Sequence, residues 1–210
     1  DIGSGWGSLA MYLAENADVN VVGLTLSEKQ LHAARTEADR RGLSSQVEFR
    51  LEDYRQHEGL YDSIVSVGMF EHVGRRNFQQ FFKQLRSLLK PNGVSLIHTI
   101  GQHTPPSTTN SWIRRHIFPG GYIPAASETI RAIERSGLVM TDLEVWRQHY
   151  ALTLREWHRR FQASRETIRH PKGERFCRIW EFYLGISATA FEVANLVVFH
   201  LQLSTRNDVV

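Results

Sequence analysis

Short apolar runs alternate with segments of helical spacing over the first hundred residues. The apolar runs are rich in Val and Ile, are flanked by turn residues, and cover 19–26, 47–51, 61–68 and 93–100. Apolar residues at helical spacing cover 6–15, 27–41 and 77–89. Runs of this kind predict buried strands, and strands that alternate with helices predict a parallel sheet. We therefore expect an α/β fold with a mostly parallel sheet and helices on both faces.

Two local signals predict helix boundaries in this half of the chain. Ser27 followed by Gln30 is typical of a capping box, which predicts the start of the second helix. The sequence KPNG at 90–93 combines Pro and Gly, and it predicts the end of the third helix before the next strand.

The pattern changes after residue 100. The Pro/Ser/Thr-rich stretch 101–111 predicts a loop or lid. After it, the pattern predicts a turn at 118–124, a helix at 127–136, a strand at 138–146, helices at 154–170 and 174–194 separated by HPKG, and an antiparallel last strand at 196–203. We expect one domain over 1–210, with a core at 1–100, lid and substrate helices at about 101–195, and the last strand. The lid helices should cover the carboxyl ends of the strands, where open α/β sheets bind ligands.

Composition narrows the class of protein. Hydrophobic residues make up 41% and charged residues 22% of the chain, as in soluble globular proteins. The single cysteine, Cys177, excludes an internal disulfide and a thiolate-rich metal site, and it fits a reducing compartment such as the cytoplasm. No apolar stretch reaches the ~18 residues that span a bilayer.

The net charge of +3 is small, but basic residues gather in two places. They are Arg114, Arg115 and His116, and then Arg155, Arg159, Arg160, Arg165 and Arg169. Two interpretations stay open: a solvated helix face, or contact with an anionic surface such as phospholipid headgroups.

The chain begins DIGSGWG, a loop with glycines at positions 3, 5 and 7. Glycine permits a tight turn and close approach of the backbone to a ligand. The spacing G-x-G-x-G differs from the dinucleotide fingerprint G-x-G-x-x-G. About twenty residues on, the uncharged Thr25, Ser27 and Gln30 stand where a nicotinamide enzyme carries an acid. A nicotinamide oxidoreductase is therefore a disfavoured rival.

Several ordered motifs resemble the cyclopropane-fatty-acyl-phospholipid synthase family, which includes the mycolic acid cyclopropane synthases. They are DIGSGWG, GLTLSEKQ, EDYR, IVSVGMFEHVG, LKPNGVSLIHTIG, FPGGYIP and ERFCRIWEFYLGISATAF, and they extend along the whole chain. The resemblance implies a Rossmann-like class I S-adenosylmethionine (SAM)-dependent methyltransferase with a helical lid. It also implies that the chain begins inside the first strand and lacks a preceding segment, so that it would bind cofactor poorly.

The resemblance implies a set of SAM contacts. These are Asp1, Gly3, Ser4, Gly5, Trp6, Gly7, Thr25, Leu26, Ser27, Gln30, Tyr54 and Arg55. Loop N–H groups suit the carboxylate of SAM, Thr25 and Gln30 suit ribose hydroxyls, and Tyr54 suits the adenine. For Trp6 and Tyr54, simple packing at a strand end is the alternative.

The family reaction adds the sulfonium methyl group to a cis double bond, and a bound bicarbonate then removes a proton so that the ring closes. The resemblance implies bicarbonate contacts at Glu71, His98, the backbone of Ile100, and Tyr150. Glu71 would accept the proton of bicarbonate, and His98 and Tyr150 would donate to its other oxygens. Aromatic residues of the later helices, Trp157, Phe161, Phe182 and Tyr183, would either stabilise the carbocation or form ordinary core.

The sequence departs from the family pattern at cysteine positions. Ser4 replaces a loop cysteine, Ser187 replaces a late cysteine, and a further bicarbonate-site cysteine would lie before residue 1. Cys177 is expected to pack in the interior. Direct methyl transfer needs no thiolate nucleophile, so these changes are compatible with the reaction.

The resemblance therefore implies cyclopropane ring formation on unsaturated phospholipid acyl chains, with SAM and bicarbonate and without a metal. Methylation of lipids without ring closure, N- or O-methylation of a small molecule, and an inactive binding protein are the alternatives. We expect a cytoplasmic protein at the inner face of the membrane, with no nucleic-acid partner, and a homodimer stays open.

Overall fold

The computed structural model describes residues 1–208; the last two residues of the predicted domain, 209 and 210, lie outside the described residues. The elements of the sheet half are α1 (Ser8–Asn16), β1 (Val21–Thr25), α2 (Glu28–Arg41), β2 (Val47–Leu51), β3 (Tyr61–Val67), the short 3₁₀ turns η1 (Phe70–His72) and η2 (Arg75–Asn77), α3 (Phe78–Leu88) and β4 (Leu89–Gln102). The remaining elements are α4 (Ser111–His116), α5 (Ala126–Glu134), β5 (Val139–Trp146), α6 (His149–Ala163), α7 (Arg165–Lys172), α8 (Glu174–Val193) and β6 (Leu196–Ser204).

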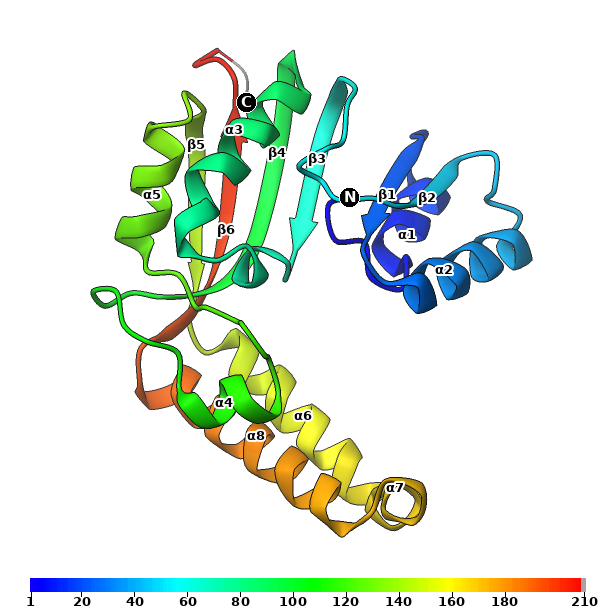
Figure 1. Ribbon diagram of the computed structural model, residues 1–210, viewed down its shortest axis with the longest axis vertical. Coiled ribbons are helices and arrows are strands. Elements are labelled where there is room, and N and C mark those ends of the chain that lie inside the picture. Colours follow the sequence, from blue (N-terminus) through cyan, green and yellow to red (C-terminus); the bar gives the residue numbers. More distant parts are fainter. Residues whose placement is uncertain (209–210) are drawn as a thin grey trace.

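The strands form two sheets that the first residues of the chain connect. Strands β1 and β2 pair in parallel, and the larger sheet has the order β3-β4-β6-β5. Strand β6 runs antiparallel to both β4 and β5, as the sequence predicts for the last strand. The N-terminus lies between the sheets (Figure 1), where Ile2 N–H donates to Val65 and Leu24 N–H donates to Asp1. The α/β class predicted from the sequence is confirmed.

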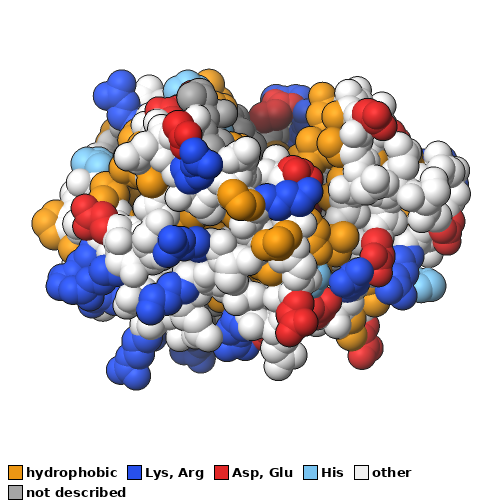
Figure 2. Space-filling model, turned by 90° about the horizontal axis from the view of Figure 1, so that it is seen from above, with side chains coloured by type: hydrophobic (Ala, Val, Ile, Leu, Met, Phe, Trp, Pro, Cys, Tyr) orange, Lys and Arg blue, Asp and Glu red, His pale blue; other side chains and the backbone are white. Residues whose placement is uncertain are grey.

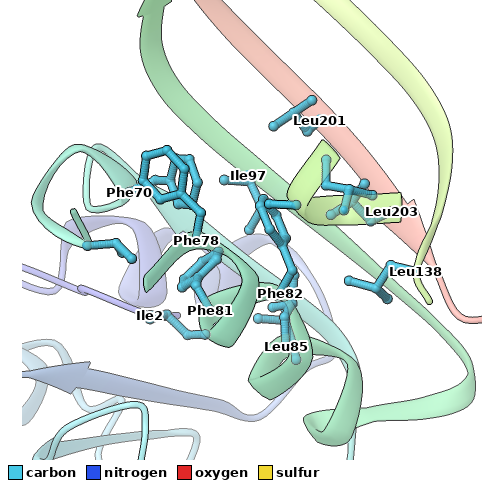
Figure 3. Close-up of a cluster of buried hydrophobic side chains, with 14 of the residues drawn as sticks. Ile2, Phe70, Phe78, Phe81, Phe82, Leu85, Ile97, Leu138, Leu201 and Leu203 are labelled. Carbon is cyan, nitrogen blue, oxygen red and sulfur yellow. The ribbon is translucent and has the colours of Figure 1, made fainter. Parts of the chain in front are cut away.

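A phenylalanine-rich core holds α3 against the larger sheet (Figure 3). Phe78, Phe81, Phe82, Leu85 and Leu88 recur at helical spacing and are buried. The Phe70 ring lies 4.4–5.3 Å from three of these rings, so η1 joins the same core. The core therefore fixes the segment that directly follows β3.

Helices α4, α6, α7 and α8 extend past the ends of β3 and β4 as an arm (Figure 1). The arm has its own core, which includes Leu154, Cys177, Tyr183 and Leu184. Among the described residues, no helix combines the length and apolar character needed to cross a bilayer.

The five arginines of the second basic cluster are paired with nearby glutamates. The pairs are Arg155–Glu192, Arg159–Glu156, Arg160–Glu156, Arg165–Glu174, Arg165–Glu181 and Arg169–Glu166. On the end of the molecule opposite the arm, Figure 2 likewise shows basic and acidic side chains interspersed. This pairing favours a solvated helix face over an anion-binding patch for the second basic cluster.

Three details of the predicted elements are wrong. Helix α4, which the sequence analysis did not predict, follows the predicted lid loop. Asn110 caps this helix by accepting from the N–H groups of Trp112 and Ile113. The predicted helix 154–170 is two helices that meet at Ser164, and α7 continues through Pro171. KPNG lies inside β4, where the register with β3 shifts, and it does not precede the strand.

Candidate active site

The glycine loop turns from Ile2 into α1 and packs against the segment that follows β3. A Cβ atom at Gly3 would lie 2.7 Å from the Met69 side chain, so the loop and Met69 are in direct contact. Gly5 has a φ of +57°, and a Cβ atom there would meet no other atom within 4 Å. Its backbone therefore faces open space that a ligand could occupy. Ser4 points inward: its hydroxyl and its N–H both donate to the Leu24 carbonyl, so neither donor is left for a ligand.

The turn after β1 is built around Thr25. Its hydroxyl donates to the Gln30 side-chain carbonyl at 2.9 Å and accepts from the N–H of Ser27. Ser27 accepts from the Gln30 N–H, so the N-cap half of the predicted capping box is present, while the Gln30 side chain binds Thr25 instead. The Gln30 amide group is thus held with its NH₂ end available, and Thr25 acts as its support.

Four further residues are predicted to contact the cofactor, and their exposure and partners differ. Trp6 and Leu26 are 60% and 72% exposed, so the Trp6 ring does not pack in the core of the described residues. Tyr54 is half-buried with its ring edge-on to Phe81, so it does pack against the core. Arg55 is exposed and forms an ion pair with Asp53.

Glu71 follows β3 by four residues and presents a buried carboxyl group. Its Oε1 accepts from the N–H of Ile100 at 2.6 Å, whereas Oε2 is buried without a hydrogen-bond partner. Burial raises the pKa of this carboxyl, and the N–H donors partly oppose the rise. The resemblance implies a bicarbonate contact through the backbone of Ile100, and the N–H of that backbone is already occupied by Glu71.

A cavity of about 450 Å³ lies between this strand end and the arm. Gly68, Glu71, Ile100, Tyr150 and Ser187 line it. Burial and the negative charge of Glu71 raise the pKa of Tyr150, so its hydroxyl is a proton donor at neutral pH. Three of the four predicted catalytic residues thus meet at one cavity, together with the serine at the family cysteine position.

His98 is the predicted catalytic residue that does not line this cavity. Its Nδ1 lies 2.8 Å from Nε2 of His200 on β6. The backbone of His98 is nevertheless adjacent, because its carbonyl accepts from the N–H of Gly68, which lines the cavity.

Sequence reasoning missed several residues of the cavity wall. Gln102 and Asn195 line it, and their amides are hydrogen-bonded to each other at 3.1 Å. They are 93 residues apart, so only the pairing of β4 with β6 brings them together. Of the four aromatic residues proposed for the carbocation, Tyr183 lines the cavity, Phe161 is buried in the arm core, and Trp157 and Phe182 are largely exposed.

The buried carboxyl predicts a pH-dependent effect of Glu71→Gln on stability. The pKa of Glu71 is higher in the folded protein than in the unfolded chain. The free energy of unfolding is therefore at its full value below the unfolded pKa, and it falls as pH rises through the folded pKa. The uncharged variant avoids that loss. We expect its melting temperature to exceed that of the wild type at about pH 7.5 by at least ~2 °C, and the gain to vanish near pH 4. Thermal unfolding at both pH values checks this, and an equal difference at both would contradict it.

The fold and the site together define a class I SAM-dependent methyltransferase fold, with a glycine loop beside a cavity at the carboxyl ends of the strands. The model of the family described as "Mycolic acid cyclopropane synthetase" matches residues 1–201. The chain belongs to this family.

Three known proteins illustrate the similarity. Cyclopropane-fatty-acyl-phospholipid synthase of Escherichia coli K12 is 39% identical over 204 residues, covering 97% of this chain and 52% of the relative. Tuberculostearic acid methyltransferase UfaA1 of Mycobacterium tuberculosis is 37% identical, covering 97% and 49%. The structure of mycolic acid cyclopropane synthase CmaA1 in complex with SAH and CTAB superposes with a TM-score of 0.89 at 30% identity, covering 97% and 76%. The chain spans about half the length of the curated relatives it matches.

Proposed function

We propose that this protein transfers the methyl group of SAM to the cis double bond of an unsaturated phospholipid acyl chain and closes a cyclopropane ring. One observation carries the proposal: the segment 68–71 contacts the glycine loop and also lines the cavity. Met69 contacts Gly3 of the loop, while Gly68 and Glu71 line the cavity. A methyl donor on the loop would therefore lie beside a substrate in the cavity.

The residues around the glycine loop fit SAM. The open backbone of Gly5 suits the amino-acid end of the cofactor, and the free NH₂ group of Gln30 suits a ribose hydroxyl. Trp6 and Leu26 offer exposed apolar surface that an adenosine group would cover. The relative CmaA1 has been crystallised with SAH, the demethylated form of this cofactor.

The cavity residues suit an alkene substrate that passes through a carbocation. An alkene is a weak nucleophile, so the protein acts mainly by holding it in line with the methyl donor, which can supply roughly 7–11 kcal/mol. The aromatic rings of Tyr150, Tyr183 and Phe191 line the cavity and can stabilise a developing cation. The arm, whose residues Tyr183, Ser187 and Phe191 line the cavity, would limit the access of water that would quench the cation.

The unpaired Oε2 of Glu71 fits bicarbonate, because a buried acceptor without a donor suits the O–H group of that ion. Glu71 and Tyr150 would hold it, the first as acceptor and the second as donor. Bicarbonate, when bound, would supply a base for the proton that leaves at ring closure. The role of Ser187, on the same wall, would be packing and not nucleophilic attack.

Methylation without ring closure is the second candidate, because the relative UfaA1 is named a methyltransferase and is nearly as similar as the synthase. The cavity residues that bind the cofactor and the alkene would be the same in both reactions. For either product, we propose that the protein works in the cytoplasm at the inner face of the membrane, where such acyl chains are found.

Cofactor binding should depend on Gly5 and not on a matched glycine elsewhere. Gly5→Ala is expected to weaken SAM binding at least ~10-fold, because the new methyl group enters space that the cofactor needs. Gly42→Ala is the control: Gly42 caps α2 with φ +71° and also has open space at its Cβ position. Both variants bear the same backbone strain of about 1–2 kcal/mol. Calorimetric titration with SAM checks this, and equal affinities in the two variants would contradict it.

The reaction itself is tested with methyl-labelled SAM and vesicles of unsaturated phospholipid. Ring closure and a saturated methyl branch differ by two hydrogens in product mass, and proton NMR separates cyclopropyl from olefinic hydrogens. Cyclopropyl product supports the proposal, and branched or methylene product supports the second candidate. Label in a soluble amine or alcohol, with none in lipid, would overturn both.

A further inference from the structure

Three side chains form a row across neighbouring strands behind the active-site wall. His98 on β4 is paired in register with His200 on β6, and His200 with Glu144 on β5. Nδ1 of His98 lies 2.8 Å from Nε2 of His200, and Nδ1 of His200 lies 3.3 Å from Oε2 of Glu144. The row therefore extends from a half-buried histidine in the sheet to an exposed carboxylate on the edge strand.

The carboxylate end of the row is fixed by Trp146. The indole N–H of Trp146 donates to Oε2 of Glu144 at 3.1 Å, and its ring packs on His200 with centroids 4.3 Å apart. On its other side Trp146 contacts His149 of α6, with centroids 5.2 Å apart. Among residues 1–208, the ionisable side chains that contact His200 are thus His98 and Glu144, and His149 is the next one beyond the indole.

The carboxylate of Glu144 determines which ring nitrogen of each histidine carries the hydrogen. A lone pair on Nδ1 of His200 would face the negative oxygen of Glu144, so the hydrogen of neutral His200 belongs on Nδ1. Nε2 of His200 then carries the lone pair and accepts from Nδ1–H of His98. Nε2 of His98 is consequently left without a hydrogen.

We propose that His200 and Glu144 are positioning residues that hold His98 in its neutral Nδ1–H form, which makes Nε2 of His98 a hydrogen-bond and proton acceptor. This differs from the donor role that the sequence suggests for His98. The catalytic part of the inference rests on the proposed function, since His98 adjoins Gly68 and Ile100 of the cavity. The assignment of hydrogens does not depend on it.

Burial and the neighbouring His200 lower the pKa of His98, which agrees with a neutral ring at neutral pH. A neutral acceptor next to the cavity suits a reaction that releases a proton at ring closure.

The hydrogen positions can be read by two-bond ¹H–¹⁵N NMR of the histidine rings at about pH 8, above the ordinary histidine pKa. We expect His98 and His200 both to carry hydrogen on Nδ1. His200→Phe removes the acceptor, so His98 should shift towards the Nε2–H form. Glu144→Gln should weaken the preference of His200 for Nδ1–H. Asp142→Asn, two residues away on the same exposed strand, is the matched control and should change neither ring.

Kinetics then tests the positioning role. In His200→Phe we expect kcat to fall roughly 10-fold with an unchanged KM for SAM. The proposal would be overturned if wild-type His98 carries its hydrogen on Nε2, or if the hydrogen positions change in neither variant. It would also be overturned if the hydrogen positions change in His200→Phe but kcat does not. If the hydrogens lie where expected but the protein methylates no lipid, the hydrogen-bonded row is supported and the proposed function is contradicted. Because Glu144 is exposed, its variant keeps the test valid if His200→Phe does not fold.

Discussion

Glu71→Gln is expected to lower the rate of cyclopropane formation by about 10²–10⁴-fold while SAM binding is unchanged. The amide preserves the shape of the side chain and can still accept from the Ile100 N–H. It replaces the buried, unpaired Oε2 with a donor, which removes the acceptor proposed for the proton-transfer site. Bicarbonate would be the general base of ring closure, and a general base typically contributes this range of acceleration. Initial rates with labelled SAM and binding titrations measure the two effects separately.

Glu134→Gln, on the exposed side of α5, is the control for loss of one carboxylate. It should turn over as the wild type does. The predicted gain in stability of Glu71→Gln at neutral pH adds a second check, because an inactive protein that melts later than wild type has not lost activity by unfolding. An active Glu71→Gln variant would remove Glu71 from the chemistry.

Gly101→Ala is expected to destabilise the protein by about 3 kcal/mol or more. A Cβ atom at Gly101 would lie 2.1 Å from the ring of Phe199, and both residues are buried in paired strands. The ring cannot move without disturbing the core between β6 and α3. For a domain of this size, such a loss lowers the melting temperature by roughly 6–12 °C.

Gly185→Ala provides a control of opposite sign. Gly185 lies within α8, and a Cβ atom there would meet nothing within 4 Å. Alanine is a better helix former by about 1 kcal/mol, so this variant should melt at a higher temperature than the wild type. Calorimetry of the two variants side by side measures both shifts. A stable Gly101→Ala protein would mean that the β4–β6 pair is less tightly packed than the structure indicates.

The parts of the site that the sequence predicts are those determined by neighbours in the chain. The Thr25 turn and Glu71 follow β1 and β3 within a few residues, and the glycine loop follows the bridge at Ile2, so local sequence places all three close together. The pairing of Oε1 with the Ile100 N–H was not predictable in the same way, because it depends on the register of β3 with β4.

The residues that sequence reasoning missed come from long-range pairing. His200 lies 102 residues after His98 and carries no motif, so only the β4–β6 register reveals the contact. Similarly, nothing in the composition of 154–170 signals the break at Ser164, which is a feature of how α6 and α7 each pack on α8.

The rate at which a thiol reagent labels Cys177 can measure the opening of the arm. Cys177 is the only cysteine of the chain and is fully buried in the core that joins α6 to α8. A thiol reagent can reach it only when these helices separate, so the rate of labelling reports how often the arm opens. If a bound acyl chain holds the arm closed, labelling should slow in proportion to the fraction of protein that carries lipid.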